Sequence, residues 1–160
     1  HWSVIAQQTL FSPRQYPSGV RSTDSWDGYP AARERLLQSL QRHPQRNTVF
    51  LGGDTHQNYV CNVLAEPDRA DAPVLASEFC GTSITSRSGA TQAKVDAIAR
   101  HNPHVLLARC DLRGYGLADV TPSRWTTTLR VLDDPLRIDS GATSLARFVV
   151  EDGHPGPQHA

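Results

Sequence analysis

An aspartate and a histidine stand two residues apart in the segment Gly52-Gly53-Asp54-Thr55-His56, directly after the apolar run 48–51. A carboxylate and an imidazole are common metal ligands, and both reach one cation when the backbone between them is extended or tightly turned. The two preceding glycines permit such a turn. The spacing therefore predicts metal ligands at a strand tip. Asp-x-His is also a short pattern, and a capped turn beside a surface histidine explains it equally well.

The elements before this motif determine where it lies. Residues 4–11 mix apolar and polar side chains as a strand does, and 48–51 has the length and β-rich composition of a buried strand. Between them, Pro30 suits the first turn of a helix that runs to about Arg42 with an apolar leucine stripe. The order strand, long loop, helix, strand favours an α/β arrangement with ligands at the carboxyl ends of strands.

The rest of the chain predicts one further helix and several strands. The helix spans 91–101, where Val95, Ile98 and Ala99 have helical spacing. Strands are predicted at 58–64, 74–80, 105–109, 114–121, 125–133 and 144–151, the later ones as antiparallel neighbours with one solvated face. Residues 152–160 are polar and contain Pro and Gly, so we expect a flexible tail after a single domain at 1–151.

Two polar loops leave alternatives open. Residues 14–29 have loop composition but carry Trp26 and Tyr29, which either anchor the loop on the core or line a pocket. Residues 81–89 are dense in hydroxyl groups between glycines, which suits either an anion cradle or an ordinary solvated loop.

Composition excludes several classes of function. The 160 residues carry 16 basic and 16 acidic side chains with no basic run, so there is no nucleic-acid-binding signature. No apolar segment is long enough for a transmembrane helix, and no signal core is present. The cysteines Cys61, Cys80 and Cys110 form no Cys-x-x-Cys pair and lie in apolar runs, which indicates buried thiols, with a disulfide as the alternative. A serine hydrolase is disfavoured because there is no Gly-x-Ser-x-Gly elbow.

Several sequence blocks, taken in order, match one family. They are 2–8 (WSVIAQQ), 24–37 (DSWDGYPAARERLL), 49–56 (VFLGGDTH), 78–79 (EF), 82–86 (TSITS), 102–104 (NPH), 113–115 (RGY) and 121–125 (TPSRW). This series resembles the carboxyl-terminal half of the catalytic domain of alkaline phosphatase D (PhoD-type) metallophosphatases, over nearly the whole chain to about residue 134.

The resemblance implies α/β architecture, as part of a calcineurin-like α/β/β/α sandwich with mixed sheets flanked by helices. It implies a metal-dependent phosphoric ester hydrolase that cleaves phosphomonoesters and phosphodiesters, in some members as a phospholipase D. Iron and calcium are the implied cofactors, and an exported protein, extracellular or periplasmic, is implied. Asp54 and His56 match the metal-binding block. The implied candidates for the substrate cleft are Asp24, Trp26, Asp27, Tyr29 and Asn58.

The chain departs from the family pattern in one important respect. The remaining metal motifs belong to the amino-terminal half, and none is found here, so no catalytic residue is assigned and the isolated chain is expected to be inactive. The chain contains no methionine and opens on His1-Trp2-Ser3, which suggests a piece of a longer precursor. A companion polypeptide or a missing amino-terminal segment would complete the centre. The alternative is a non-catalytic binding domain in which Asp54 and His56 are structural.

Overall fold

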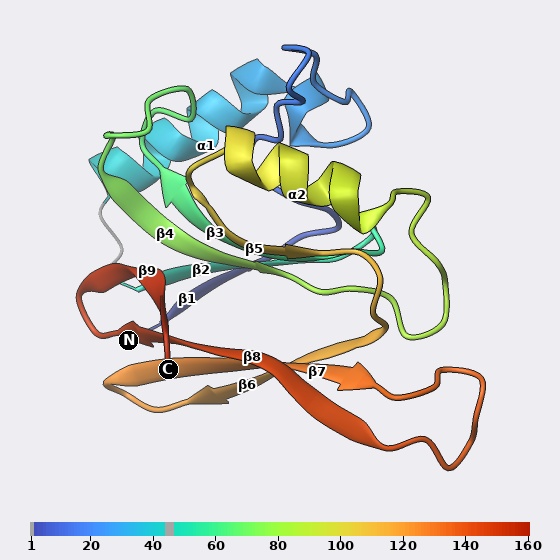
Figure 1. Ribbon diagram of the computed structural model, residues 1–160. Helices are drawn as coiled ribbons and strands as arrows, with labels where there is room; N and C mark the ends of the chain where they lie inside the picture. The colour runs from blue at the N-terminus through green and yellow to red at the C-terminus, as the bar shows by residue number, and fades with distance from the viewer. Residues whose placement is uncertain (1, 44–46) are drawn as a thin grey trace.

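The computed structural model describes residues 2–43 and 47–160. These residues form two facing β-sheets, with helices packed on the outer face of the first sheet (Figure 1). The first sheet has the strand order β1-β2-β4-β3-β5, with β1 Ser3–Ala6, β2 Thr48–Gly52, β3 Asn58–Leu64, β4 Val74–Cys80 and β5 Val105–Arg109. The second has the order β6-β7-β8-β9, with β6 Gly114–Val120, β7 Arg124–Leu132, β8 Ala142–Glu151 and β9 His154–His159.

The first sheet is mixed, as the family resemblance implies. Strands β1, β2 and β4 are parallel, and β3 runs antiparallel to both β4 and β5. The carboxyl ends of β1 and β2 therefore lie side by side at the same end of the sheet. This end carries the segment after Ala6 and the segment after Gly52, so the topology places the candidate metal motif beside the chain that leaves β1.

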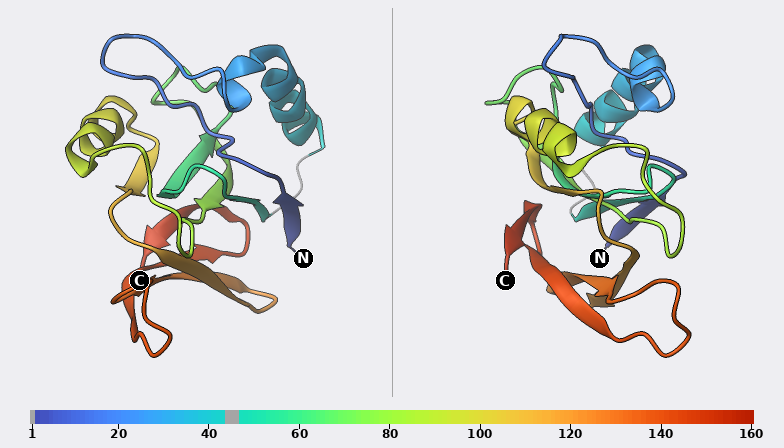
Figure 2. Two further views of the ribbon diagram at one scale, coloured as in Figure 1. Left: turned by 90° about the vertical axis from the view of Figure 1, so that its right-hand side faces the viewer. Right: turned by 45° about the vertical axis from the view of Figure 1, so that its right-hand side comes forward.

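The two α-helices have the expected bounds. Helix α1, Pro30–Arg42, begins with Pro30 in its first turn and buries Leu37, and a short 3₁₀ helix η1, Trp26–Gly28, precedes it. Helix α2, Gln92–His101, is capped by Thr91, whose side chain accepts a hydrogen bond from the Lys94 amide. Both helices lie on the same face of the first sheet in the two views of Figure 2. No helix in the described part of the chain is long and apolar enough to cross a membrane.

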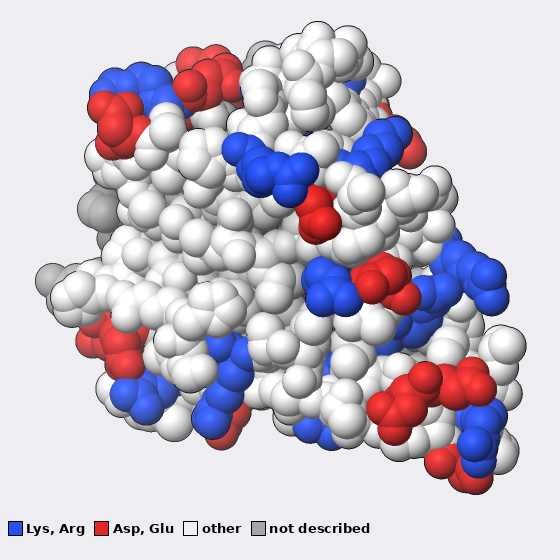
Figure 3. All heavy atoms as spheres, in the orientation of Figure 1, with Lys and Arg blue, Asp and Glu red and all other residues white. Residues whose placement is uncertain are grey.

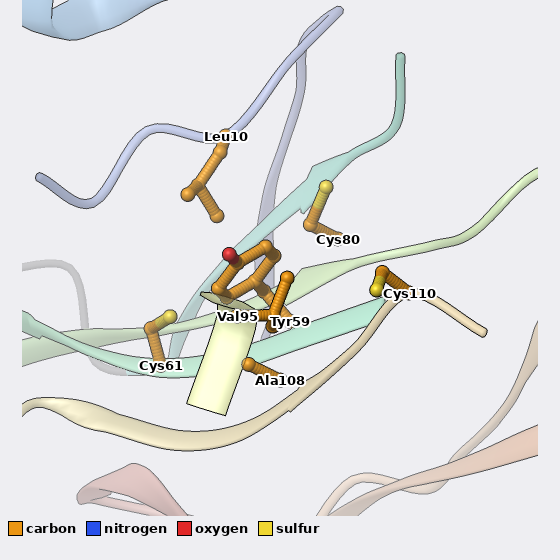
Figure 4. Packing of buried hydrophobic residues seen from close by; sticks show 7 residues of the cluster. All are labelled: Leu10, Tyr59, Cys61, Cys80, Val95, Ala108 and Cys110. Atoms are coloured by element: carbon orange, nitrogen blue, oxygen red, sulfur yellow. The ribbon is translucent and has the colours of Figure 1, made fainter. Parts of the chain in front are cut away.

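Apolar side chains fill both layers of the fold. Between the sheets, Val49, Val60 and Phe79 pack against Trp125 and Phe148 of the second sheet, among others. Beneath α2, the fully buried Tyr59 ring lies among the residues labelled in Figure 4: Leu10, Cys61, Cys80, Val95, Ala108 and Cys110. The three cysteines are buried and free, so the prediction of buried thiols is confirmed.

Two predicted segments differ from the structure. The first strand ends at Ala6 instead of Phe11, because the amides of Phe11 and Ser12 bind the buried Glu78 carboxylate (2.6 and 2.8 Å) and leave the sheet. The expected flexible tail is instead strand β9, paired with β8. Gly153 turns the chain with φ 76°, and the Gly156 amide then donates to Ser77 Oγ at 3.1 Å. The turn brings the tail alongside β8 in the second sheet, and the Ser77 contact attaches it to β4 of the first sheet.

The charged side chains on the visible face show no concentration of one sign. In Figure 3, basic and acidic residues are interspersed on this face, and neither forms a continuous patch. This distribution agrees with the formal net charge of zero. Electrostatic attraction on this side is therefore local, and individual carboxylates and their partners decide where it acts.

Candidate metal and substrate site

Close backbone packing shapes the tip of β2. An added Cβ at Gly52 would lie 2.5 Å from the Thr9 carbonyl oxygen, so only glycine fits there. The next amide, Gly53 N, donates to the Gln8 carbonyl oxygen at 3.1 Å. These two contacts hold the segment that follows β1 directly against the end of β2.

The sharp turn at this tip is made by the two candidate ligands themselves. Asp54 and His56 have φ values of 64° and 55°, in the left-handed region that non-glycine residues seldom adopt. Gly53 takes part in the turn as well, since its carbonyl oxygen accepts from the Thr55 amide at 2.7 Å, whereas Gly52 serves close packing. A non-glycine residue in the left-handed region costs conformational energy. Such residues persist only where the surrounding structure holds them, and they cluster at functional sites. Their occurrence at both candidate positions marks the tip as a functional candidate.

Cys80 supports the turn from below. Its Sγ donates to the Gly53 carbonyl oxygen at 3.3 Å and lies 3.6 Å from Thr55 Oγ1. Burial raises the pKa of the Cys80 thiol to about 12. The protonated thiol acts as a hydrogen-bond donor to the turn.

The His56 ring is oriented by a backbone carbonyl. His56 Nδ1 lies 3.2 Å from the Arg87 carbonyl oxygen, and the neighbouring Gln57 Nε2 donates to Ser88 Oγ at 3.0 Å. A carbonyl oxygen only accepts, so Nδ1 carries the proton in this contact. Nε2 then holds the free lone pair that a metal requires, the arrangement usual for metal-binding histidines.

Asp54 and three of the predicted cleft residues line one cavity. The cleft measures about 990 Å³ and contains Asp24, Trp26, Tyr29 and Asp54 in its wall. The other lining residues are Gln7, Gln8, Thr9, Thr23, Ser25 and Ala32. Both charged lining residues are carboxylates, and neither carboxylate has a hydrogen bond or ion pair within the described residues. Two uncompensated negative charges favour a cationic occupant on this side of the tip.

The aromatic residues of the loop divide between two roles. Trp26 Nε1 donates to Gln7 Oε1 at 3.0 Å, and the Trp26 ring packs edge-on against Phe11 at 5.0 Å between centroids. Trp26 thus anchors the loop and also lines the cleft. Tyr29 also lines the cleft but is 67% exposed, so its side chain packs little against the core. Trp26 therefore both anchors the loop on the core and lines the pocket, whereas Tyr29 lines the pocket without being buried in the core.

Two predicted cleft residues lie elsewhere. The Asp27 side chain is 1% exposed and pairs with Arg33, with Oδ1 to Nη1 at 2.6 Å, while Oδ2 accepts from the Arg14 amide at 2.9 Å. Asn58 is 1% exposed, and its Oδ1 accepts from the Thr82 amide at 3.1 Å. Neither is among the residues that line this cleft. A polar residue beside a motif is indistinguishable in sequence from one that faces it.

Two hydroxyl groups of the loop 81–89 bond within the chain. Thr82 Oγ1 donates to the Leu112 carbonyl oxygen at 3.1 Å, and Ser83 Oγ donates to the Ser86 carbonyl oxygen at 2.5 Å. The loop thereby holds the Arg87 carbonyl oxygen against His56. Its role at the site is orientation of the imidazole.

Several contributors to the site were missed from the sequence. Gln7, Gln8 and Thr9 line the cleft but were placed inside a strand, and their only signal was the polar content of that run. The Arg87 carbonyl oxygen left no signal, because any residue supplies a backbone carbonyl.

A buried polar cluster holds the cleft loop in place. Glu78 accepts from the Phe11 and Ser12 amides, and burial raises the pKa of its carboxyl group. His104 Nε2 lies 2.9 Å from the Pro13 carbonyl oxygen, and burial lowers the pKa of this imidazole. Together with the pair between Asp27 and Arg33, these contacts fix both ends of the loop that carries Asp24 and Trp26.

The tip offers two suitable metal ligands, which is fewer than a complete coordination shell needs. Asp54 offers an unpaired carboxylate and His56 an oriented imidazole, both suitable ligands. Within residues 2–43 and 47–160, no group of three or more His, Cys, Asp or Glu side chains converges as a metal site would require. The chain alone therefore provides part of a coordination shell.

Comparison with known proteins gives consistent matches. A family model described as PhoD-like phosphatase matches residues 1–129. The chain is 34% identical to alkaline phosphatase D of Bacillus subtilis (strain 168), over 98% of this chain and 27% of that protein. Its structure is similar to one titled "Structure of PhoD", with a TM-score of 0.88 and 32% identity, over 99% of this chain and 31% of that one. The chain thus spans about a third or less of the length of these relatives.

Proposed function

This chain belongs to the PhoD-like phosphatase family, and from that premise we propose that it supplies one wall of a metal-dependent phosphoesterase centre. Its two sheets and helices are part of the calcineurin-like α/β/β/α sandwich, as the sequence predicts. The observation that carries the proposal is that Asp54, whose carboxylate has no described partner, and His56, whose ring is oriented by a carbonyl oxygen, lie two residues apart in one left-handed strand tip.

Each residue of the tip has a defined task in this proposal. Asp54 would hold the metal through an anionic oxygen, and His56 through the neutral Nε2. The chemistry supplied at the site would then be polarisation of a phosphoryl oxygen and a lowered pKa of the attacking water. Asp24, Trp26 and Tyr29 line the space in which the ester group lies, and Trp26 excludes water from its base.

The finer activity belongs to the same proposal. We expect hydrolysis of phosphomonoesters and phosphodiesters, including phospholipase D-type substrates, with iron and calcium as the metals and a site of action outside the cytoplasm. The support is family membership, together with the one carboxylate and the one imidazole at the tip.

The proposal also requires further ligands. A two-metal centre needs more donors than one carboxylate and one imidazole, so a companion polypeptide or an amino-terminal segment of the same precursor must supply them. The chain by itself is then inactive toward phosphate esters. Domain 1–151 would act as the carboxyl-terminal half of the catalytic domain.

Substitution in the assembled protein tests the function. Asp54→Asn and His56→Ala should each lower bound metal at least tenfold, and hydrolysis of bis-p-nitrophenyl phosphate should fall with it. Asp68→Asn, which changes an exposed carboxylate that pairs with Arg21 and does not line the cleft, should leave both unchanged. Normal metal content and normal hydrolysis in both tip variants would refute the assignment.

One observation favours a second function, a non-catalytic binding domain. The described residues contain no complete set of metal ligands, as a structural Asp54 and His56 would allow. Elemental analysis separates the two functions, because the enzyme requires bound transition metal in the assembled protein. A well-folded assembly that contains no metal would support the binding domain.

A further inference from the structure

The loop after β4 borders the tip of β2 on the side away from the cleft. Strands β1, β2 and β4 are adjacent in the first sheet and run parallel, with β2 in the middle. Their carboxyl ends therefore lie side by side at one end of the sheet. The segment after β1 lines the cleft, whereas the segment after β4, which begins with the loop 81–89, extends on the other side of β2 (Figure 1). The tip thus lies between the cleft and this loop.

The backbone of the loop is held in place around Arg87. The Arg87 carbonyl oxygen lies 3.2 Å from His56 Nδ1. Ser88 Oγ accepts from Gln57 Nε2 at 3.0 Å and from the Ala90 amide at 3.2 Å. Because His56 and Gln57 belong to the segment that follows β2, these contacts place the backbone of Arg87 directly beside the candidate metal ligands.

The Arg87 side chain, by contrast, has no partner in the described part of the chain. It is exposed, and its guanidinium group makes no hydrogen bond or ion pair within residues 2–43 and 47–160. A neighbouring arginine differs in this respect. The loop joins β6 through a bond of 3.0 Å from the Gly114 amide to the Ser83 carbonyl oxygen. Just before this contact, Arg113 Nη1 donates to the Asp111 carbonyl oxygen at 3.0 Å. Arg87 therefore combines a fixed backbone with an unengaged cation.

A guanidinium group in this place favours an anionic ligand. Arginine stays charged over the whole physiological pH range, and its planar fork of N–H donors matches the oxygens of a phosphate group in pairs. The proposed function brings a phosphate ester to the same tip. The ester is therefore the anion that the unengaged side chain can bind.

We propose that Arg87 is a specificity-determining residue that binds a terminal oxygen of the substrate's phosphoryl group and favours phosphomonoesters over phosphodiesters. The inference rests on the proposed function, because it concerns the ester cleaved at Asp54 and His56. It assigns the loop 81–89 a contact with the substrate in addition to the orientation of the imidazole.

The two sides of the tip divide the substrate between them. The organic group of the ester lies in the cleft beside Trp26 and Tyr29, so the terminal oxygens face the opposite side, where Arg87 lies. A phosphomonoester has three terminal oxygens and roughly two negative charges at neutral pH. In a phosphodiester, a second organic group replaces one of these oxygens and a single charge remains. The interaction with Arg87 is therefore stronger for the monoester, and the second group of a diester would displace the guanidinium.

Substitution of this side chain leaves its backbone contact in place. In Arg87→Gln the positive charge is lost, while the carbonyl oxygen of residue 87 still contacts His56. The metal content of the assembled protein should therefore stay unchanged, which separates a side chain that binds substrate from one that shapes the tip. Arg87→Lys retains the charge without the paired donors. Arg100→Gln is the matched control, since Arg100 is an exposed arginine in the last turn of α2 with no described partner.

Kinetics with two substrates measure the preference in the assembled protein. In Arg87→Gln, kcat/KM for p-nitrophenyl phosphate should fall at least about tenfold, and kcat/KM for bis-p-nitrophenyl phosphate should fall less than about threefold. Arg87→Lys should recover part of the loss, and Arg100→Gln should change neither value. Equal losses on the two substrates, no loss, the same loss in Arg100→Gln, or a fall in metal content would each overturn the proposal.

Binding of inorganic phosphate provides a readout that does not depend on turnover. Calorimetric titration of the assembled protein should give a dissociation constant at least about tenfold larger in Arg87→Gln than in the unaltered protein. Arg100→Gln should match the unaltered protein. Equal affinities in Arg87→Gln and the unaltered protein would overturn the proposal, even where hydrolysis changed.

Failure here is distinguishable from failure of the proposed function. An assembled protein that holds metal and hydrolyses both esters, with the same selectivity in Arg87→Gln, would retain the phosphoesterase and overturn only the role of Arg87. An unaltered assembly with neither metal nor hydrolysis would refute the proposed function, and this inference with it.

Discussion

Carboxylates and histidines gather in two regions of this molecule, and their partners differ. In the buried cluster beneath the helices, Asp27 pairs with Arg33, Glu78 accepts from two amides, and His104 contacts a carbonyl oxygen. At the strand tip and the cleft beside it, the Asp54 and Asp24 carboxylates have no described hydrogen-bond or ion-pair partner, and only one His56 nitrogen is engaged. The same residue types are thus structural where they are satisfied and available to a ligand where they are not.

The largest expected effect is on the ion pair of the buried cluster. Asp27→Ala leaves Arg33 buried without its partner, which should lower the free energy of unfolding by about 3 to 5 kcal/mol. Asp24→Ala, three positions earlier and exposed, should change it by less than about 0.5 kcal/mol. Urea denaturation of both variants measures the difference. Equal stabilities would break the distinction between the two regions.

Glu78 should show the next largest effect. Glu78→Ala removes the acceptor of two buried amides, for a loss of about 2 kcal/mol or more in unfolding free energy. Glu66→Ala, at an exposed carboxylate that pairs with Arg69, should cost less than about 1 kcal/mol. Thermal unfolding of the two variants provides the test. An unchanged unfolding temperature in Glu78→Ala would show that the hydrogen bonds from the Phe11 and Ser12 amides do not stabilise the fold.

His104 should give the buried cluster a pH dependence. Burial places its folded-state pKa below the unfolded value of about 6.5, so the unfolded chain binds more protons below that pH. The contribution of His104 to the free energy of unfolding is fully present above about pH 6.5 and is lost as the pH falls through the folded-state pKa. Nearby Asp27 opposes the pKa shift, and Arg33 and Arg21 reinforce it.

The measurement is the slope of unfolding free energy between pH 7 and pH 5. The slope should diminish in His104→Gln and persist in His101→Gln, whose ring is exposed. An unchanged slope in His104→Gln would show that this imidazole titrates alike in both states.

The smallest effect on stability is expected at the tip. Asp54→Asn should alter unfolding free energy by less than about 0.5 kcal/mol, because the carboxylate has no described partner to lose and asparagine tolerates a left-handed backbone. Gly52→Ala is the contrasting change nearby, since its Cβ would lie 2.5 Å from a backbone oxygen and must displace the segment that lines the cleft. Denaturation of both variants should show a clear loss for Gly52→Ala alone.

Much of the fold could be predicted from the sequence, and the failures have physical causes. Helix α1 and strand β2 were predicted because an apolar stripe and a β-rich run encode them locally. The end of β1 was misplaced because it depends on Glu78, 67 residues away from Phe11. Strand β9 was missed because its residues are polar and its pairing with β8 is a tertiary effect.

The candidate site was predictable in part for a similar reason. Asp24, Trp26 and Tyr29 line one cleft together with Asp54. Asp27 and Asn58 are polar as well, but their side chains are buried and bind Arg33 and the Thr82 amide. Sequence identifies residues capable of binding chemistry, and only the three-dimensional partners decide which of them remain free.

The central claim is that the tip binds a metal ion and the buried cluster does not. Histidine NMR spectra of this chain during titration with Mn²⁺ test it directly, because the paramagnetic ion broadens nearby imidazole signals. The account predicts selective broadening of His56 at concentrations that leave His104 and the surface histidines sharp, with loss of the effect in Asp54→Asn. Broadening of all exposed histidines alike, or an unaffected His56, would contradict it.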